Sequence, residues 1–283
     1  MTAARLGWLV SYPKSGNTWL RMMLSSLMKD GEPVDINGNI EGRIASFAEM
    51  DELLGIDASE LTESEIAAAQ PALHQALTTT TSRTPLLRKV HDRFWRTPSG
   101  AAAFPPDASC GAVYLVRDPR DIAVSYSRHS GTTIDRIIDS MADDGALLGS
   151  SPIRAKAQLR QPVGSWSGHV RSWLEQDEIP VLTLRYEDML GAPGASLAAA
   201  AAHLGIGATF ARVEAAVAAT RFDILSAQEK AYGFRERHLK ATTPFFREGQ
   251  SGDWRIWLSS EQADRLIDHH GAVMKQLGYL PQD

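Results

Sequence analysis

The sequence of 283 residues contains a single cysteine, Cys110, and no run of about 18 consecutive apolar residues. One cysteine excludes an internal disulfide and a cysteine-based metal cluster, and it points weakly to a reducing compartment. Without a long apolar run, no membrane-spanning helix is expected. The apolar stretch that follows Met1–Arg5 is too short for the core of a secretory signal. These absences predict a cytoplasmic protein.

An excess of positive charge is also missing, because the formal net charge is -5. This charge argues against binding to nucleic acid over a broad surface, but it leaves room for a local basic pocket. The hydrophobic fraction of 43% and the charged fraction of 22% are those of an ordinary globular protein. A chain of this length can bury a large core, and we expect one domain over residues 1–283.

Short apolar runs rich in β-branched and aromatic residues alternate with segments of helical periodicity. The runs lie at 6–11, 86–91, 112–117 and 181–186, and the helical segments at 18–29, 119–128, 165–176, 195–204, 211–219 and 260–277. This alternation predicts an α/β fold, in which a central parallel sheet is flanked by helices.

Two stretches, 31–85 and 130–163, differ from the rest in amino-acid composition, with more Gly, Ser and Thr, and are interpreted as insertions on the common core. The first contains helical patches at 44–54 and 63–77. The polar segment 228–252 has weak periodicity, so it is either a mobile flap over a site or a plain surface loop.

The first apolar run is followed by a loop of small residues, 12–19, and then by an amphipathic segment. A helix that begins directly after a strand and such a loop directs free backbone N–H groups and a positive dipole end to one point. Lys14 adds a full charge, and Ser15 and Thr18 add hydroxyl donors. The loop therefore predicts an anion site, although a simple strand–helix turn is the alternative. Lys14 precedes Gly16, so the spacing of a nucleoside-triphosphate loop is absent.

A second anion signal lies at the end of the third run. Arg117 ends that run, and Ser125 follows eight residues later in a predicted helix that Asp118 can cap before Pro119. Open α/β sheets bind ligands at the carboxyl ends of their strands, which would place Arg117 beside the Lys14 loop. Two alternatives remain open: a surface ion-pair cluster, and a magnesium ligand at Asp118 as in a nucleotide kinase.

His91 ends the second run and shares an alternating face with Lys89. Such a pair at the ligand edge of a sheet suits a general base and a cation facing developing negative charge, while a purely structural histidine is the alternative. Apolar residues near the insertions suit a small organic ligand or belong to the core: Phe47, Leu53, Phe94 and Trp95.

Taken together and in this order, these residues resemble the family of sulfotransferases that use PAPS (3'-phosphoadenosine 5'-phosphosulfate). The matching segments are 12–19, 117–125, 164–173, 185–189 and 246–254, and the similarity extends from Leu6 to Tyr279. It implies a single α/β domain related in shape to P-loop nucleotide kinases, which binds PAPS as donor, releases PAP and needs no metal. The acceptor it implies is a hydroxyl of a small organic or natural-product molecule, with the insertions shaping the acceptor site.

The resemblance also implies roles for individual residues. His91 would be the general base, and Lys14 and Lys89 would stabilise the leaving group and the transferred sulfuryl group. The donor would be held by Lys14, Ser15, Gly16, Asn17, Thr18, Trp19, Arg117, Ser125, Tyr186, Thr220, Phe222, Arg247 and Gly249. Glu248 departs from the family, which commonly has a lysine there, and residues 256–259 replace part of a dimer motif, so the oligomeric state stays open.

Two other functions fit the same sequence. A nucleotide kinase would use Lys14 for phosphates and Asp118 for magnesium, and a non-catalytic protein would only bind an adenosine phosphate. The placement of Arg117 and Ser125 favours the sulfotransferase over the kinase, and the His91–Lys89 pair favours an enzyme over a binding protein.

Overall fold

The sheet has four parallel strands in the order β2-β1-β3-β6. The computed structural model describes residues 5–79, 84–149, 158–246 and 249–282. The strands are β1 (Leu6–Ser11), β2 (Leu86–Val90), β3 (Ser109–Val116) and β6 (Val181–Arg185). All four coincide with the predicted apolar runs, except that His91, Arg117 and Tyr186 follow their strands and β3 begins three residues earlier. The predicted α/β fold with a central parallel sheet is confirmed.

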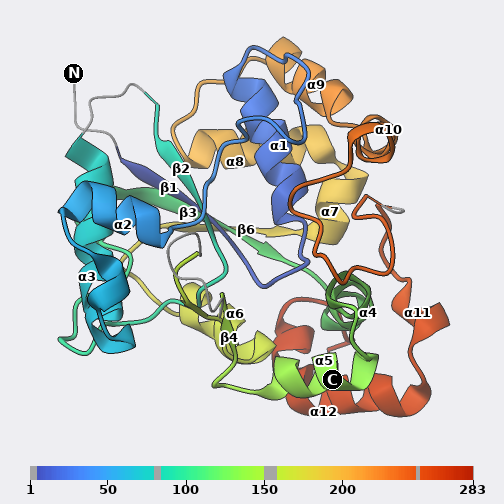
Figure 1. Ribbon diagram of the computed structural model, residues 1–283. Helices are drawn as coiled ribbons and strands as arrows, with labels where there is room; N and C mark the ends of the chain where they lie inside the picture. The colour runs from blue at the N-terminus through green and yellow to red at the C-terminus, as the bar shows by residue number, and fades with distance from the viewer. Residues whose placement is uncertain (1–4, 80–83, 150–157, 247–248, 283) are drawn as a thin grey trace.

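Alternate residues of the strands enter two separate cores, one on each face of the sheet. Trp8 and Val10 of β1 belong to one core, and Leu9 between them belongs to the other. Strands buried on both faces are expected where helices cover a parallel sheet from both sides. Figure 1 shows these two helical layers. One layer contains α1 (Asn17–Met28), α8 (Pro193–His203) and α9 (Phe210–Ala219); the other contains α4 (Pro119–Ser130), α5 (Ile134–Ala142), α6 (Trp166–Leu174) and α12 (Ser260–Gln276).

The two predicted insertions pack together beside the β2 edge of the sheet. The first contains α2 (Phe47–Leu54) and α3 (Glu63–Ala76), and the second contributes the short antiparallel pair β4 (Leu147–Leu148) and β5 (Gln161–Pro162). The Leu159 amide donates to the Ala45 carbonyl oxygen at 3.0 Å, which joins them. Arg43 also forms a parallel bridge with Arg88, so part of the first insertion runs along the outer edge of β2.

Some elements were not predicted by periodicity. These are α5, the short helices α7 (Tyr186–Gly191), α10 (Phe222–Tyr232) and α11 (Trp254–Trp257), and the 3-10 turns Ala58–Glu60, Leu77–Thr79 and Pro106–Ala108. α10 covers the start of the segment 228–252, which is therefore not a loop throughout. Its apolar residues are interrupted by charged ones, so the helical pattern is weak.

All four strands end at the same edge of the sheet, and each is followed by a residue of the candidate site. The loop at 12–19 follows β1, His91 follows β2, Arg117 follows β3 and Tyr186 follows β6.

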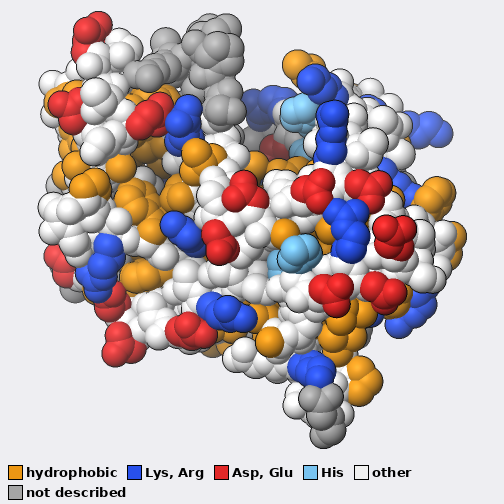
Figure 2. Space-filling model, turned by 90° about the horizontal axis from the view of Figure 1, so that it is seen from below, with side chains coloured by type: hydrophobic (Ala, Val, Ile, Leu, Met, Phe, Trp, Pro, Cys, Tyr) orange, Lys and Arg blue, Asp and Glu red, His pale blue; other side chains and the backbone are white. Residues whose placement is uncertain are grey.

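On the face that Figure 2 shows, positive and negative side chains of the described residues are intermixed. Within the described ranges no helix has the length and apolar character needed to cross a membrane.

A buried ion pair fixes the junction between β3 and α4. The Asp118 carboxylate accepts from the Arg120 amide at 2.9 Å, which caps α4, and from Arg120 Nη2 at 2.7 Å. Both side chains are less than a tenth exposed. The Arg120 guanidinium also lies 3.9 Å from the centre of the Trp254 ring and donates to the Tyr279 carbonyl oxygen. Asp118 thus acts as the predicted helix cap and joins α4 to the C-terminal part of the chain.

Asp118→Ala is expected to lower the free energy of unfolding by about 3 kcal/mol, because it leaves the Arg120 charge buried without its partner and removes a helix cap. Urea denaturation measures this loss. The matched control is Asp135→Ala, which removes an exposed carboxylate paired with Arg265 and should change stability little. Equal effects of the two substitutions would contradict the structural role of the buried pair.

Candidate active site

A cavity of about 1150 Å³ opens at the carboxyl edge of the sheet. It is lined by the loops that follow the four strands, by both insertions and by the segment after α10. The predicted site residues that line it are Lys14, Gly16, Asn17, Thr18, Trp19, Lys89, His91, Arg117, Ser125, Tyr186, Phe222 and Gly249. The fold therefore brings together residues from six distant parts of the sequence.

The loop after β1 bends back on itself before α1. Lys14 and Gly16 both have positive φ angles, 70° and 97°. A Cβ atom at Gly16 would lie 2.6 Å from Cδ2 of Tyr186, so the position needs glycine for contact as well as for conformation. No side chain caps α1, and the first amides of a helix have no partner inside it. These amides are available to an anion.

Asn17 and Ser15 contribute to this loop in different ways. Asn17 Nδ2 donates to the Leu9 carbonyl oxygen at 2.8 Å and to Ser11 Oγ at 3.2 Å. Its side-chain donor therefore holds the loop against β1, so its backbone amide remains as a donor for a ligand, while Asn17 Oδ1 is buried without a partner among the described residues. Ser15 is fully buried and does not line the cavity, yet its hydroxyl oxygen has no hydrogen-bond partner among the described residues.

Lys14 and Lys89 lie in the cavity with their charges only partly compensated. Burial, together with repulsion from Lys89 and Arg117, lowers the pKa of Lys14 to about 7. Its ammonium group lies 4.1 Å from the centre of the Phe245 ring. Burial also lowers the pKa of Lys89, against the attraction of Glu236. An anion bound between the lysines would restore their charged forms.

Arg117 is held by the backbone on both sides of the cavity. Its guanidinium donates to the carbonyl oxygens of Lys14 at 3.2 Å and Gln250 at 3.1 Å, and it stacks 4.3 Å from the centre of the Tyr186 ring. Its Nε is buried without a partner among the described residues. Asp121 fixes the neighbouring C-terminal loop by accepting from two backbone amides, those of Gly252 and Trp254.

His91 has a defined orientation. Its Nδ1 lies 2.7 Å from the Ser11 carbonyl oxygen, which can only accept, so Nδ1 carries the proton and Nε2 keeps its lone pair. Gln161 Oε1 accepts from the His91 amide, and His169 Nε2 donates to the His91 carbonyl oxygen at 3.1 Å. Burial and the Lys89 charge lower the pKa of His91 to about 3. The imidazole is therefore neutral at pH 7 and able to accept a proton.

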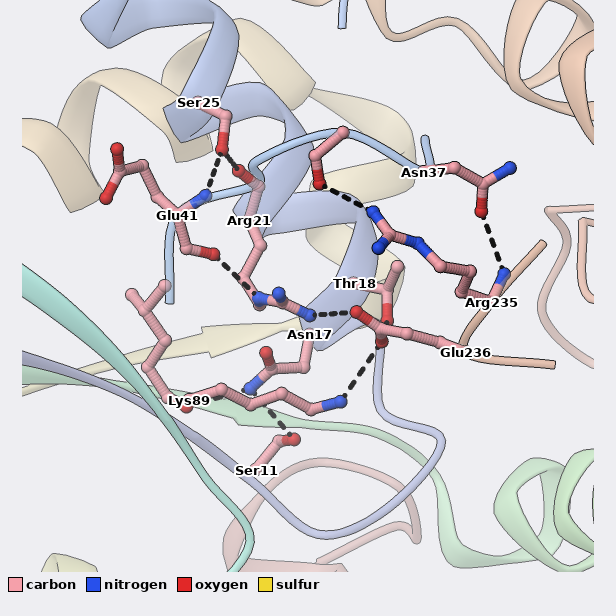
Figure 3. A network of polar contacts seen from close by, with 12 residues as sticks. Ser11, Asn17, Thr18, Arg21, Ser25, Asn37, Glu41, Lys89, Arg235 and Glu236 are labelled. Atoms are coloured by element: carbon pink, nitrogen blue, oxygen red, sulfur yellow. Dashed lines mark hydrogen bonds and ion pairs between the residues drawn. The ribbon is translucent and has the colours of Figure 1, made fainter. Parts of the chain in front are cut away.

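A carboxylate that the sequence did not indicate, that of Glu236, lies between Arg21 and Lys89 (Figure 3). Glu236 accepts hydrogen bonds from Arg21 Nη1 at 2.7 Å, Lys89 Nζ at 3.2 Å and Thr18 Oγ1 at 3.3 Å. Arg21 lies one helical turn after Thr18, on the side of α1 that faces the cavity. This spacing was the sequence signal that could have placed Arg21 at the site. His129 was also missed. It lines the cavity near the end of α4.

Other predicted residues lie outside the cavity or outside the described chain. Thr220 is fully buried, its hydroxyl donates to the Ala216 carbonyl oxygen, and its own carbonyl accepts from Trp19 Nε1. Arg247 and Glu248 lie outside the described residues. None of the four apolar candidates for an acceptor pocket lines the cavity, namely Phe47, Leu53, Phe94 and Trp95. Phe47, Phe94 and Trp95 pack against hydrophobic cores instead.

Asp118 does not have a free carboxylate for magnesium, because both oxygens accept from Arg120. In the part of the chain that the structure describes, no group of three or more His, Cys, Asp or Glu side chains is arranged to hold a metal ion.

A family model described as a sulfotransferase domain matches residues 7–278. The chain belongs to the sulfotransferase family. It is 26% identical over 274 residues to sulfotransferase 1B1 of Mus musculus, in a match that covers 91% of this chain and 79% of the mouse protein. It is also 26% identical over 290 residues to flavonol 3-sulfotransferase of Flaveria bidentis, with coverage of 94% and 83%.

Solved structures show the same fold for this sulfotransferase. Retinol dehydratase in complex with androsterone and the inactive cofactor PAP superposes with a TM-score of 0.58 at 17% identity, covering 95% of this chain and 80% of that one. Mouse sulfotransferase SULT7A1 complexed with PAP gives 0.56 at 20% identity, with coverage of 96% and 85%. The family assignment makes this protein an enzyme, a PAPS-dependent sulfotransferase, and PAPS is its sulfuryl donor.

The geometry fits such a donor. Arg117 lines the cavity, and its buried Nε lacks a partner among the described residues. Glycine at position 16 lets the Tyr186 ring lie against the loop, where a Cβ atom would collide with it. Lys14 and Lys89 also have lowered pKa values, which a bound anion would reverse.

Gly16→Ala in this sulfotransferase is expected to weaken PAP binding at least about tenfold, because the new methyl group displaces Tyr186 from Arg117 and strains the loop. Isothermal titration calorimetry measures the affinity. Gly55→Ala is the control, since Gly55 also has a positive φ, 64°, but a Cβ atom there would meet no other described part of the chain within 4 Å. The control should lose about 1 kcal/mol of stability and bind PAP normally; weaker binding in both variants would contradict the Tyr186 contact.

Proposed function

We propose that this sulfotransferase moves the sulfuryl group of PAPS to a hydroxyl group of a small organic molecule, with His91 as the general base. The observation that carries the proposal is the orientation of His91. Its Nδ1 is engaged by the Ser11 carbonyl oxygen while Lys89 and the Lys14 loop line the same cavity. This arrangement supports a site that combines a base, a cation for the transferred group and a phosphate-binding loop.

The donor residues divide into two groups by position. The α1 amides, Thr18 and Lys14 would hold the 5'-phosphosulfate, because they surround the start of the helix. Arg117 and Ser125 would hold the 3'-phosphate, with Arg247 as a further ligand. Gly249 lines the cavity against Phe222, and Phe222, Trp19 and Tyr186 would enclose the adenine. Thr220 would support this wall from behind rather than touch the nucleotide.

The proposed chemistry is a single in-line displacement. The acceptor oxygen forms a bond to sulfur while the bond from sulfur to the 5'-phosphate oxygen breaks, and His91 Nε2 takes the hydroxyl proton. Lys89 would stabilise the sulfuryl oxygens, and Lys14 the negative charge on the leaving phosphate. An anion beside Lys89 would also offset the repulsion that lowers the pKa of His91, which makes the imidazole a stronger base in the complex.

The acceptor would lie against the insertions of one domain that spans residues 1–283. The cavity volume lies just above the range of about 300–1,000 Å³ that is typical for one drug-sized ligand, so an acceptor fits beside the donor. Ile44 and Leu148 come from the two insertions and line it together with Tyr126. A hydroxyl acceptor is supported by the flavonol named for one relative and the androsterone bound in one neighbour.

We also propose a cytoplasmic location, which the single cysteine supports. A nucleotide kinase is the weaker alternative, because Asp118 is occupied by Arg120. A transfer assay with labelled PAPS and a panel of phenols, alcohols and sterols tests the function directly. Product formation supports it, and PAP binding without transfer to any hydroxyl compound would favour a binding protein.

His91→Asn is expected to lower kcat about 10²–10⁴-fold while the affinity for PAP stays within twofold. The asparagine amide can still donate to the Ser11 carbonyl oxygen, but the proton acceptor at Nε2 is lost. Steady-state kinetics and calorimetry separate the two effects. The control is His269→Ala, which removes an exposed histidine on α12. Turnover that survives within a few-fold in His91→Asn would remove the general-base role.

PAP binding is expected to take up close to one proton at pH 8 and to weaken as the pH rises above 7. The pKa of Lys14 is lowered to about 7 in the free protein, and a bound phosphate raises it by favouring the charged form. Below pH 7 Lys14 is already charged, so this uptake disappears. Calorimetry at pH 8 in two buffers with different ionisation enthalpies counts the protons.

Lys14→Arg provides the control for this linkage, because a guanidinium stays charged at pH 8. The variant should bind PAP with much smaller proton uptake than the parent protein. Uptake of the same size in both proteins would assign the titrating group elsewhere.

A further inference from the structure

The Glu236 carboxylate fills an anion site made by three groups of the donor region. The site consists of Thr18 Oγ1, Arg21 Nη1 and Lys89 Nζ, which all donate to Glu236. Two of the three, Thr18 and Lys89, are the groups that the proposed function assigns to the phosphosulfate. A carboxylate of the protein and an oxyanion of the donor therefore need the same hydrogen bonds.

The backbone beside Glu236 is fastened from outside the site. Asn37 Oδ1 accepts from the Arg235 amide at 2.9 Å, and Asn37 Nδ2 donates to the Gly233 carbonyl oxygen at 2.9 Å. Arg235 Nη2 also donates to the Gly38 carbonyl oxygen at 3.2 Å (Figure 3). These contacts hold the segment against the first insertion. They direct Glu236 toward α1, so its position is built by the fold.

Electrostatics keep this carboxylate charged. Burial alone would raise the pKa of Glu236, but the attraction of Lys89 and Arg21 outweighs it and lowers the pKa to about 2. The side chains of Arg21 and Lys89 are 6% and 12% exposed, so each needs a nearby anion. Glu236 supplies that anion when no ligand does.

We propose that Glu236 is an internal competitor of the donor, which the 5'-phosphosulfate must displace from Thr18 and Lys89 before it can bind. The inference rests on the proposed function for the assignment of those two residues. Arg21 is not assigned to the donor, so it can keep Glu236 paired after the exchange. The apparent affinity for the donor is then reduced by the fraction of molecules in which the site is open.

This competition acts on one end of the nucleotide. A ligand with a 5'-phosphate, such as PAP, needs Thr18 of the anion site, so Glu236 weakens its binding even though PAP lacks the sulfuryl group that is assigned to Lys89. Adenosine 3'-monophosphate has no 5'-phosphate, so it uses the Arg117 side of the cavity and does not compete with Glu236. A general effect of negative charge in the cavity would weaken both ligands.

The test is calorimetric titration of PAP and adenosine 3'-monophosphate into the parent protein and Glu236→Gln. If the site is open in about a tenth of the parent molecules or fewer, PAP should bind Glu236→Gln at least about tenfold more tightly. Binding of adenosine 3'-monophosphate should change less than twofold. Glu52→Gln is the matched control, because Glu52 also lines the cavity but has no contact with the three donors among the described residues. It should leave both affinities unchanged.

The outcomes separate the inference from the proposed function. A parent protein that does not bind PAP contradicts the proposed function itself. If the parent binds PAP, an equal or weaker affinity in Glu236→Gln overturns the competition. Equal tightening of both nucleotides, or tightening by Glu52→Gln as well, also overturns it, since these results show a general charge effect.

Glu236→Gln leaves two buried cations without their anion, so a lower melting temperature without nucleotide is expected, recovered when PAP is added. Asn37→Ala gives a second test that leaves these charges paired, because it only loosens the segment that directs Glu236 into the site. It should tighten PAP binding about two- to fivefold without changing adenosine 3'-monophosphate binding. A folded Asn37→Ala protein with unchanged or weaker PAP affinity contradicts the inference.

Discussion

The burial of several mutually repelling cations in one cavity is the constraint on which the carboxyl edge of this sheet depends. Lys14, Lys89, Arg21 and Arg117 come from different elements and are brought together in one cavity. The pKa values of Lys14 and Lys89 are lowered, which shows that the assembled site disfavours its own charges. The fold therefore favours an anion there. Glu236 is such an anion, and the nucleotide in its proposed position would be another.

Neutral backbone groups hold Arg117 and His91 in place. Carbonyl oxygens of the Lys14 loop and of Gln250 fix Arg117, and the Ser11 carbonyl oxygen fixes His91. Asp121 accepts from two amides of the C-terminal loop, so its charge is used for backbone placement. Groups positioned in this way need little rearrangement when charge develops during a reaction, which is the main physical advantage of a preorganised site.

The sequence predicted those parts of the molecule that local patterns determine. Apolar runs gave the four strands, and a loop between a strand and a helix gave the position of Lys14. Contacts between distant segments could not be predicted from local patterns. Glu236 lies 218 residues after Thr18, and no periodicity links them. Thr220 was expected beside the nucleotide, and the sequence could not show that it is fully buried with its hydroxyl turned back to its own helix. Phe94 was an ambiguous candidate because an apolar side chain fits a core and a pocket equally well.

The bridge between Arg43 and Arg88 limits how the proposed acceptor wall can be altered. The first insertion both lines the cavity and runs along β2, where the Lys89 amide donates to the Arg43 carbonyl oxygen. An uncovered outer strand presents free backbone groups that pair readily with other chains. Shortening this insertion to admit bulkier acceptors would uncover β2 and promote aggregation. Point substitutions at Ile44 or Leu148 reshape the same wall and leave the strand covered.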